Sequence, residues 1–370
     1  MSVITKFSKI TLPILTTTLI LTGTIFTNKT IAAENLSYKL TNEEKNEIKK
    51  VKSFKLPNNL GLLKSEVKKN SKSKYKKAQE IVSQYYIDRG IIVSNDIDDV
   101  DYQNQVKSLG GAADVFGENT EIIVEFVKFI DLYENYQTNQ KISELMTKVN
   151  ENKISEDEVR ELLNYAPIQS TDTKTLNIPS TESNFTTFAT TFPNGYNPTA
   201  ARDYALLWTD NTIILRNNSE YSYYSNTTGT FYEGWNDCTN YVSQALRAGG
   251  FAYRGGSLTN GYTYDTAWFY TPTKPSHTWG GAYNFYRHWK VRAGVTASAA
   301  NLGTADVVNA DFTKDGDIEH TAIVTRNAST SAYGKWLSQH TPDREETTTV
   351  GTWYDLGYDV YGYEMDKATN

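Results

Sequence analysis

The sequence contains one cysteine, Cys238, among 370 residues. A single thiol cannot form an internal disulfide, so the fold must hold without one. The formal net charge of −6 leaves no excess of positive charge, which argues against a partner such as nucleic acid or an anionic membrane surface. The pattern G-x-S-x-G is absent, so a serine hydrolase of that type is not supported. Imidazole is scarce too, being present only in His277, His288, His320 and His340.

Long apolar runs are confined to the beginning of the chain. Two lysines precede an apolar or hydroxylic run at 10–26, and the small residues Ala32 and Ala33 follow it. A basic start, a short apolar core and a small-residue cleavage region are typical of a secretory signal peptide, predicted here at 1–33. We therefore expect a secreted bacterial protein, extracellular or associated with the cell wall, without a membrane segment after cleavage.

The aromatic residues divide the chain into two regions. All seven tryptophans lie beyond residue 194, whereas 34–165 is rich in Lys, Glu, Ile and Val. This contrast predicts a mainly helical accessory or pro-region at 34–165 and a catalytic domain at 194–370. A Thr- and Ser-rich stretch at 166–193 reads as the linker between them.

Hydrophobic periodicity predicts the elements of both regions. In the first region, polar groups recur at helical spacing from Glu121 to Asp131, and Ser155 with Glu158 forms a capping box. In the second region, a helix near 197–208 and another after Cys238 precede strand patterns, which lie at 306–308, 318–326 and 335–341. Helices followed by short, closely spaced strands predict an α+β fold with an antiparallel sheet.

Cys238 lies at the predicted start of a helix. The apolar stripe of that helix is formed by Tyr241, Val242, Ala245 and Leu246. Asp237 or Asn236 can cap its first turn, and Gly249 with Gly250 ends it. We expect the carboxylate of Asp237 to turn toward the backbone as a cap.

A thiol in the first turn of a helix has a reactive setting. The unpaired N–H groups and the positive end of the helix dipole favour the thiolate, and the same N–H groups can stabilise an oxyanion. The alternative is a buried cysteine that acts as a small apolar residue. Cys238 precedes the apolar stripe and is flanked by polar residues, which favours the nucleophile.

A cysteine nucleophile needs an imidazole base. His320 opens a predicted strand and shares one face with Ala322 and Val324, so it can reach a thiol borne by a helix. On the next strand, either His340 or Gln339 can face His320 and orient its ring. His277 and His288 lie in an aromatic loop and are more typical of a substrate groove or the surface.

These motifs, DCTNYVSQALRAGG, IEHTAIVT and LSQHT in that order, resemble the bacterial putative amidase domain family. This family is a branch of the papain-like cysteine hydrolases related to NlpC/P60 and CHAP, and the resemblance covers about 194–365. It implies a helix-borne cysteine packed on an antiparallel sheet, with Cys238 as nucleophile, His320 as base and His340 as the third residue. The family strand commonly begins Gly-Asp, whereas this chain has Ala305 and Asp306.

The resemblance implies cleavage of an amide bond, often in peptidoglycan or a peptide, without a cofactor. Tyr204 and Tyr232 are candidates for a second oxyanion donor. The many tryptophans and tyrosines fit a groove that stacks sugars or short peptides.

Two alternatives remain open at this point. A metal hydrolase could use the acids near His320, which are Asp311, Asp315, Asp317 and Glu319. Their spacing misses the calcium-loop pattern, so a solvated hairpin turn is favoured, and Cys238, His320 and His340 show no recognised zinc spacing. The second alternative is a noncatalytic cell-surface, carbohydrate-binding or toxin-like protein that uses the same scaffold to hold a ligand.

Overall fold

The computed structural model describes residues 38–51, 64–163, 191–211, 216–225, 230, 232–255 and 261–370. The predicted signal peptide lies outside these residues, as does the predicted linker from 166 to 190. Ser37–Asn370 forms one compact unit. Across the described ranges, every helix is too short or too polar to cross a bilayer.

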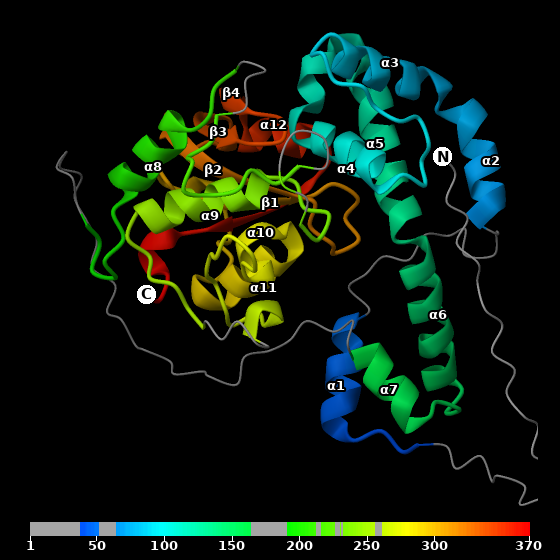
Figure 1. The fold of residues 1–370 in the computed structure, drawn as a ribbon. Helices are drawn as coiled ribbons and strands as arrows, with labels where there is room; N and C mark the ends of the chain where they lie inside the picture. Colours follow the sequence, from blue (N-terminus) through cyan, green and yellow to red (C-terminus); the bar gives the residue numbers. More distant parts are fainter. Residues whose placement is uncertain are drawn as a thin grey trace, which may run out of the picture. The chain divides into compact units, whose positions relative to one another are not determined.

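All described elements before residue 164 are helices. They are α1 (Asn42–Val51), α2 (Lys64–Lys74), α3 (Lys76–Ile87), α4 (Val100–Ser108), the 3-10 segment η1 (Leu109–Asn119), α5 (Thr120–Glu134), α6 (Tyr136–Asn150) and α7 (Glu156–Leu163). The capping box is present: the Ser155 N–H donates to Glu158 Oε2 at 3.0 Å, and the Glu158 N–H donates to Ser155 Oγ at 3.3 Å. Helices α1, α6 and α7 share a small apolar cluster of their own (Figure 1).

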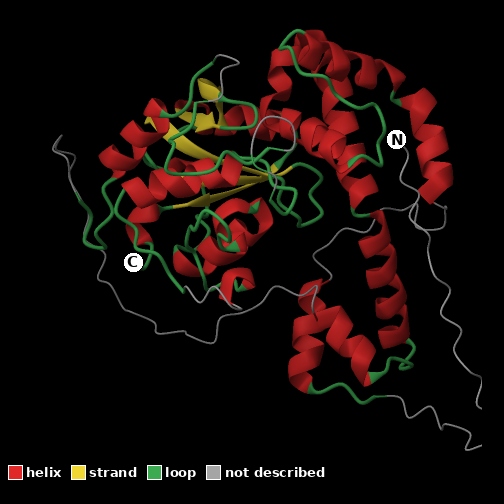
Figure 2. Ribbon diagram, in the orientation of Figure 1, coloured by secondary structure: helices red, strands yellow, loops and turns green. Residues whose placement is uncertain are grey.

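The remainder of the chain combines helices with one sheet (Figure 2). Its helices are α8 (Pro198–Leu207), α9 (Cys238–Ala248), α10 (His277–Gly280), α11 (Ala282–Arg292) and α12 (Val350–Asp355), with short 3-10 turns at Gly261–Thr263, Ala299–Asn301, Ala332–Gly334 and Met365–Lys367. Its strands are β1 (Val307–Asp311), β2 (His320–Asn327), β3 (Lys335–Gln339), β4 (Arg344–Thr349) and β5 (Asp359–Tyr363). Neighbouring strands run antiparallel in the order β4-β3-β2-β1-β5, which confirms the predicted α+β class.

Helices cover both faces of this sheet. Val307 pairs with Ile323, and both belong to the core that contains α9. The adjacent pair, Val308 with Ala322, points the other way, into a core shared with α3, η1 and α5. Part of the predicted accessory region, namely α3, η1 and α5, therefore packs on this face of the sheet.

Gly110 of η1 allows this segment to approach the sheet closely. A Cβ added to Gly110 would lie 2.4 Å from the Phe312 ring, so only glycine fits there without a shift. The Gly110 carbonyl accepts a hydrogen bond of 3.0 Å from the Tyr358 hydroxyl. Arg344 of β4 also pairs with Asp114 of η1 through two hydrogen bonds, of 2.7 and 3.1 Å. The sheet and η1 are thus joined by apolar, polar and ionic contacts.

Gly110→Ala is expected to lower the free energy of unfolding by about 1–3 kcal/mol, because the added methyl overpacks the contact with Phe312. Gly303→Ala is the matched control, since its Cβ would meet its nearest atom, on Asp306, at 3.7 Å. Chemical denaturation of both variants tests the prediction. Equal stabilities for the two variants would contradict tight packing of η1 on the sheet.

Ala305, which stands where the family pattern commonly has glycine, has an unusual backbone conformation. Ala305 has φ = 66°, in the left-handed region that glycine adopts most easily. The carboxylate of Asp306 accepts hydrogen bonds from the N–H groups of Gly303, at 2.7 Å, and Met365, at 2.8 Å. The turn into β1 thus places alanine in a conformation that glycine adopts most easily.

Candidate active site

Cys238 is the first residue of α9, as the sequence predicted. Asp237 occupies the N-cap position, and its carbonyl accepts a hydrogen bond of 2.9 Å from the Tyr241 N–H. The prediction that its carboxylate caps this helix is wrong, because the side chain makes no cap hydrogen bond. The carboxylate instead accepts from the backbone N–H of Tyr224 at 2.7 Å and from the side chain of Asn240 at 2.8 Å.

The thiol is buried, with only 3% of Cys238 exposed. Its position ahead of the apolar stripe does not leave it in solvent, because every residue from Cys238 to Leu246 is buried. Two polar side chains of this helix make internal hydrogen bonds: the Ser243 hydroxyl donates to the Trp279 carbonyl, and the Trp279 indole donates to Asn240 Oδ1. Helix α9 is therefore a central helix, covered on the side away from the sheet.

The helix-dipole argument for a resting thiolate is not supported. Burial is the largest influence on the Cys238 thiol and raises its pKa above the usual value, because a buried charge loses its hydration. Hydrogen bonds from the Thr239 side chain and the Thr321 backbone act in the opposite direction but are outweighed. Cys238 Sγ lies 3.6 Å from the Thr239 hydroxyl, which is 2.8 Å from that of Thr321. The raised pKa favours the protonated thiol at neutral pH.

His320 opens β2 and is 2% exposed. Its ring lies between two aromatic rings, with centroids 6.2 Å from Phe312 and 5.7 Å from Trp353. This apolar burial lowers the pKa of His320 to about 4, because imidazolium would lose its hydration there. At neutral pH His320 is a neutral imidazole, the form that can accept a proton.

Gln339 is the residue that lies beside His320. A Cβ added to Gly111 would meet His320 Nε2 at 2.8 Å and Gln339 Nε2 at 3.0 Å, so both side chains converge on this glycine. Gln339 shares the sheet face of Leu337, which belongs to the same core as Ala322 and Val324. Within the described residues, His320 Nε2 and Gln339 Oε1 are buried without a hydrogen bond of ordinary geometry, although the Gln339 side chain lies close enough to raise the pKa of His320 against the effect of burial.

His340 lies on the other side of β3, facing α9. Its Nδ1 is 2.6 Å from Asp237 Oδ2, its Nε2 is 2.6 Å from the Trp208 carbonyl oxygen, and Tyr241 stacks on its ring at 4.1 Å. These contacts use both ring nitrogens, so they leave none for His320. Despite burial, the carboxylates of Asp343 and Asp237 raise the pKa of His340 to about 9.

The start of β2 lies beside Cys238. Cys238 contacts Thr321, and His320 precedes Thr321 directly. Thr321 faces α9, whereas the ring of His320 belongs to the opposite face. The pairing of β2 with β3 begins at Ile323 and Ser338. The first residues of β2, which include His320 and Thr321, therefore have no paired residue on β3.

The other candidates from the sequence have different surroundings. Tyr204 donates its hydroxyl to Gln244 at 2.7 Å, beyond the first turn of α9, and Tyr232 packs on Trp235. His288 is buried against Trp289, whereas His277 is half-buried beside Trp235. Sequence reasoning missed Thr239, Thr321 and Gly111. The sequence features that could have pointed to these residues were the hydroxyl residue after the cysteine, the hydroxyl residue after the histidine, and the Gly110–Gly111 pair.

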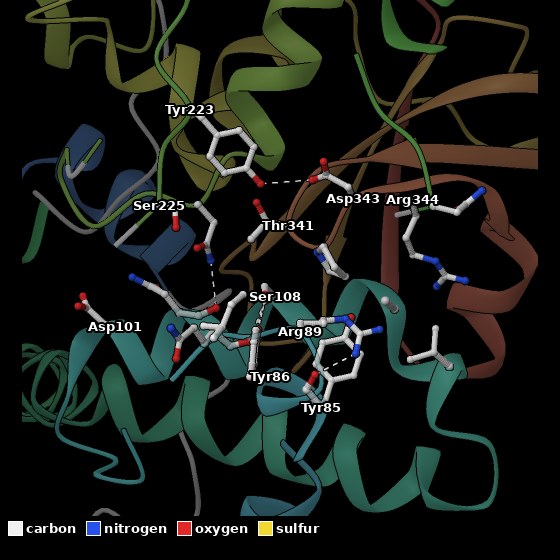
Figure 3. Close-up of a pocket in the computed structure, with 18 of the residues that line it drawn as sticks. Tyr85, Tyr86, Arg89, Asp101, Ser108, Tyr223, Ser225, Thr341, Asp343 and Arg344 are labelled. Atoms are coloured by element: carbon white, nitrogen blue, oxygen red, sulfur yellow. Dashed lines mark hydrogen bonds between the residues drawn. The ribbon is translucent and has the colours of Figure 1, made fainter. Parts of the chain in front are cut away.

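A pocket of about 310 Å3 adjoins the loop that precedes Cys238. Figure 3 shows Tyr85, Tyr86 and Arg89 on one wall and Tyr223 and Asp343 on the other. Its lining also includes Asn236, two residues before Cys238, and Thr341, whose hydroxyl accepts a hydrogen bond of 3.0 Å from the Asp237 N–H. Cys238 and His320 do not line it. The pocket thus reaches the nucleophile loop but stops short of the sulfur.

The acids beside His320 do not form a solvated turn. Asp311 and Asp315 are buried, and their carboxylates converge with that of Glu319; Asp317 and Glu319 also converge with Asp131 of α5. In each group of three, ligand atoms lie within 4.8 Å of one another, close enough to hold a cation. Burial raises the pKa of Asp311 to about 7 and that of Asp317 to about 6.

Residues 195–363 match the family model described as "Putative amidase domain". This stretch includes α8, α9 and all five strands, and the match supports amide hydrolysis as the general reaction. The chain is also similar to the uncharacterized protein YjcM of Bacillus subtilis (strain 168), with 28% identity over 224 residues. That alignment covers 57% of this chain and 45% of YjcM, so the chain spans less than half of its relative's length. No solved structure matches the chain.

Proposed function

We propose that the protein is a secreted cysteine amidase or peptidase with a papain-like arrangement, in which Cys238 is the nucleophile and His320 the base. The observation that carries the proposal is the placement of Cys238 at the start of α9 against Thr321, the neighbour of His320. The lowered pKa of His320 supports it, because a neutral imidazole at neutral pH can accept a proton. The family match over 195–363 supports the reaction class.

The protonation states define the first chemical step. Both groups are neutral at neutral pH, so the proposed step requires the ring of His320 to turn from the opposite face of the sheet toward α9 and take the proton of Cys238 as the sulfur attacks the amide carbonyl. Backbone N–H groups in the first turn of α9 stabilise the oxyanion of the tetrahedral intermediate. His320 then protonates the departing amine, and the acyl group remains on sulfur. Water activated by His320 hydrolyses this thioester, which releases the acid and restores the thiol.

Gln339, rather than His340, is proposed as the residue that orients His320. Its side chain lies on the same face of the sheet and beside the imidazole, whereas both nitrogens of His340 are engaged elsewhere. A glutamine amide can hold one tautomer of a neutral imidazole without changing its charge. This suits a base that is neutral at rest.

Peptidoglycan is the proposed source of the amide, because export would place the enzyme at the cell wall and aromatic side chains line the pocket beside the nucleophile loop. The test is to incubate the purified protein with peptidoglycan and with a panel of peptide amides, and to measure newly released amines. We expect time-dependent release by the wild type and loss of at least about a thousandfold in Cys238→Ala. His277→Gln is the matched control and should retain activity, because the ring of His277 packs against Trp235 and Tyr262 and has no part in the proposed mechanism.

The same experiment separates catalysis from ligand binding. Amine release that is unchanged in Cys238→Ala would reject the cysteine mechanism. Absence of release on every substrate, together with retained binding of peptidoglycan fragments by both proteins, would support the noncatalytic alternative. Loss of activity after chelation would instead direct attention to the acidic groups around Glu319.

A further inference from the structure

The protonation state of His340 follows from its two contacts. Its Nδ1 lies 2.6 Å from a carboxylate oxygen of Asp237, and its Nε2 lies 2.6 Å from the carbonyl oxygen of Trp208. Both partners are hydrogen-bond acceptors, so each ring nitrogen must carry a proton. A neutral imidazole has one N–H and can satisfy only one of the two. His340 is therefore an imidazolium, although only 1% of its side chain is exposed.

The partner of this cation lies directly before the nucleophile. Asp237 is fully buried, and its negative charge acts on the adjacent thiol in the direction that raises the pKa of Cys238. A carboxylate beside a sulfur disfavours the thiolate, because two like charges would share a poorly hydrated space. A counter-ion on Asp237 weakens this repulsion.

We propose that His340 is a positioning residue that neutralises Asp237 and thereby eases deprotonation of Cys238. The proposal rests on the proposed cysteine mechanism for its purpose, but the ion pair and its influence on the thiol are properties of the folded chain without substrate. It gives His340 a role different from that of orienting His320.

Other groups around His340 are consistent with this assignment. The Asp343 carboxylate lies 3.9 Å from Nε2, and its other oxygen accepts a hydrogen bond of 3.3 Å from the Tyr223 hydroxyl. The remaining titratable neighbours are the rings of Tyr223 and Tyr241, with pKa values raised by burial, so both are neutral. The groups facing the imidazolium are thus two carboxylates and two neutral tyrosines.

The same contacts fix the position of the nucleophile loop. Asp237 donates its N–H to the Thr341 hydroxyl, and its carboxylate accepts from the Tyr224 N–H and the Asn240 amide. The residue before the nucleophile is therefore tied to the end of β3, to the preceding loop and to the first turn of α9. Burial raises the pKa of Asp237, and the hydrogen bonds from Tyr224 and Asn240 act with His340 in the opposite direction.

The lone cysteine permits a direct test. Cysteine labelled with carbon-13 at Cβ gives one resonance, and its pH titration reports the thiol pKa without substrate or alkylating reagent. We expect His340→Gln to raise this pKa by about one unit, a tenfold loss of thiolate at a given pH. Asp237→Asn should not raise it, and the double variant should return toward the wild-type value. His277→Gln is the matched control and should titrate as the wild type.

Two results would overturn the proposal: an unchanged thiol pKa in His340→Gln, or a double variant whose thiol pKa is raised as much as in the single variant. A second measurement avoids dependence on folding of the variants. Nitrogen-15 spectra of the wild type should show both nitrogens of His340 protonated at pH 7.5, and one unprotonated nitrogen would also reject the ion pair. A protein that hydrolyses no amide but shows both effects would reject the amidase and leave the role of His340 intact.

Discussion

His320→Gln is expected to lower kcat/KM for amide cleavage by at least about a hundredfold, because glutamine cannot accept the thiol proton or return it to the leaving amine. The pH dependence of kcat/KM in the wild type should follow the ionisation of the His320 imidazole. Since the pKa of His320 is lowered to about 4, its neutral, basic form is present at neutral pH and is lost only as the pH falls toward 4. The rate limb assigned to His320 should therefore lie near pH 4, far below the usual imidazole value.

The measurement is kcat/KM across pH 3.5 to 8 for the wild type and for Gln339→Leu. Removing the Gln339 amide should reduce kcat while the far-ultraviolet spectrum and the unfolding midpoint stay close to those of the wild type. His277→Gln again serves as the control. An acid limb near pH 6.5 in the wild type would show that the working imidazole is exposed and is not the buried His320.

His340→Gln is expected to change the pH dependence of stability. The pKa of His340 is raised from 6.5 unfolded to about 9 folded, so the folded state binds its proton more tightly. This stabilisation is fully present below pH 6.5 and is lost as the pH rises through 9. A shift of this size corresponds to about 3 kcal/mol in the free energy of unfolding. The glutamine variant should lack this contribution at pH 6. At pH 9.5 the wild type has lost it too, so the pH-dependent difference between the two proteins should be absent.

Urea denaturation of wild type and variant at pH 6, 8 and 9.5 tests this difference. Lost packing against Tyr241 adds a cost that does not depend on pH, so the pH-dependent part is the informative one. His277→Gln should show no such loss, because burial lowers the pKa of His277 instead of raising it. A constant difference between His340→Gln and wild type at all three pH values would contradict the charged state of His340.

The sequence was sufficient for the elements that carry the candidate site. Helix α9 could be placed because Asp237 and Gly249 bracket an apolar stripe, and β2 because alternating residues after His320 are apolar. Strand β4 was not predicted, because Arg344–Thr349 contains no apolar residue. Pairing with β3 and the Arg344 contact to Asp114 define it instead, and these are tertiary interactions that local periodicity does not encode.

The chemistry of the site was harder to predict than its location. The helix dipole argues for a thiolate, but it acts locally, whereas the burial that opposes it comes from helices distant in the sequence. The choice between Gln339 and His340 was open because β3 carries polar residues on both faces. Register resolves their placement: Val324 pairs with Leu337, so Gln339 shares the face of His320, and His340 faces α9.

The packing of η1 on the sheet shows that the folded unit extends beyond the segment that matches the family model. The family model begins at residue 195, yet the side of the sheet that carries Ala322 is closed by helices from before residue 164. Without those helices, α12 of the matched segment would be left to cover this side of the sheet. What a sequence comparison recognises as the domain is therefore only part of what must assemble before His320 has its surroundings.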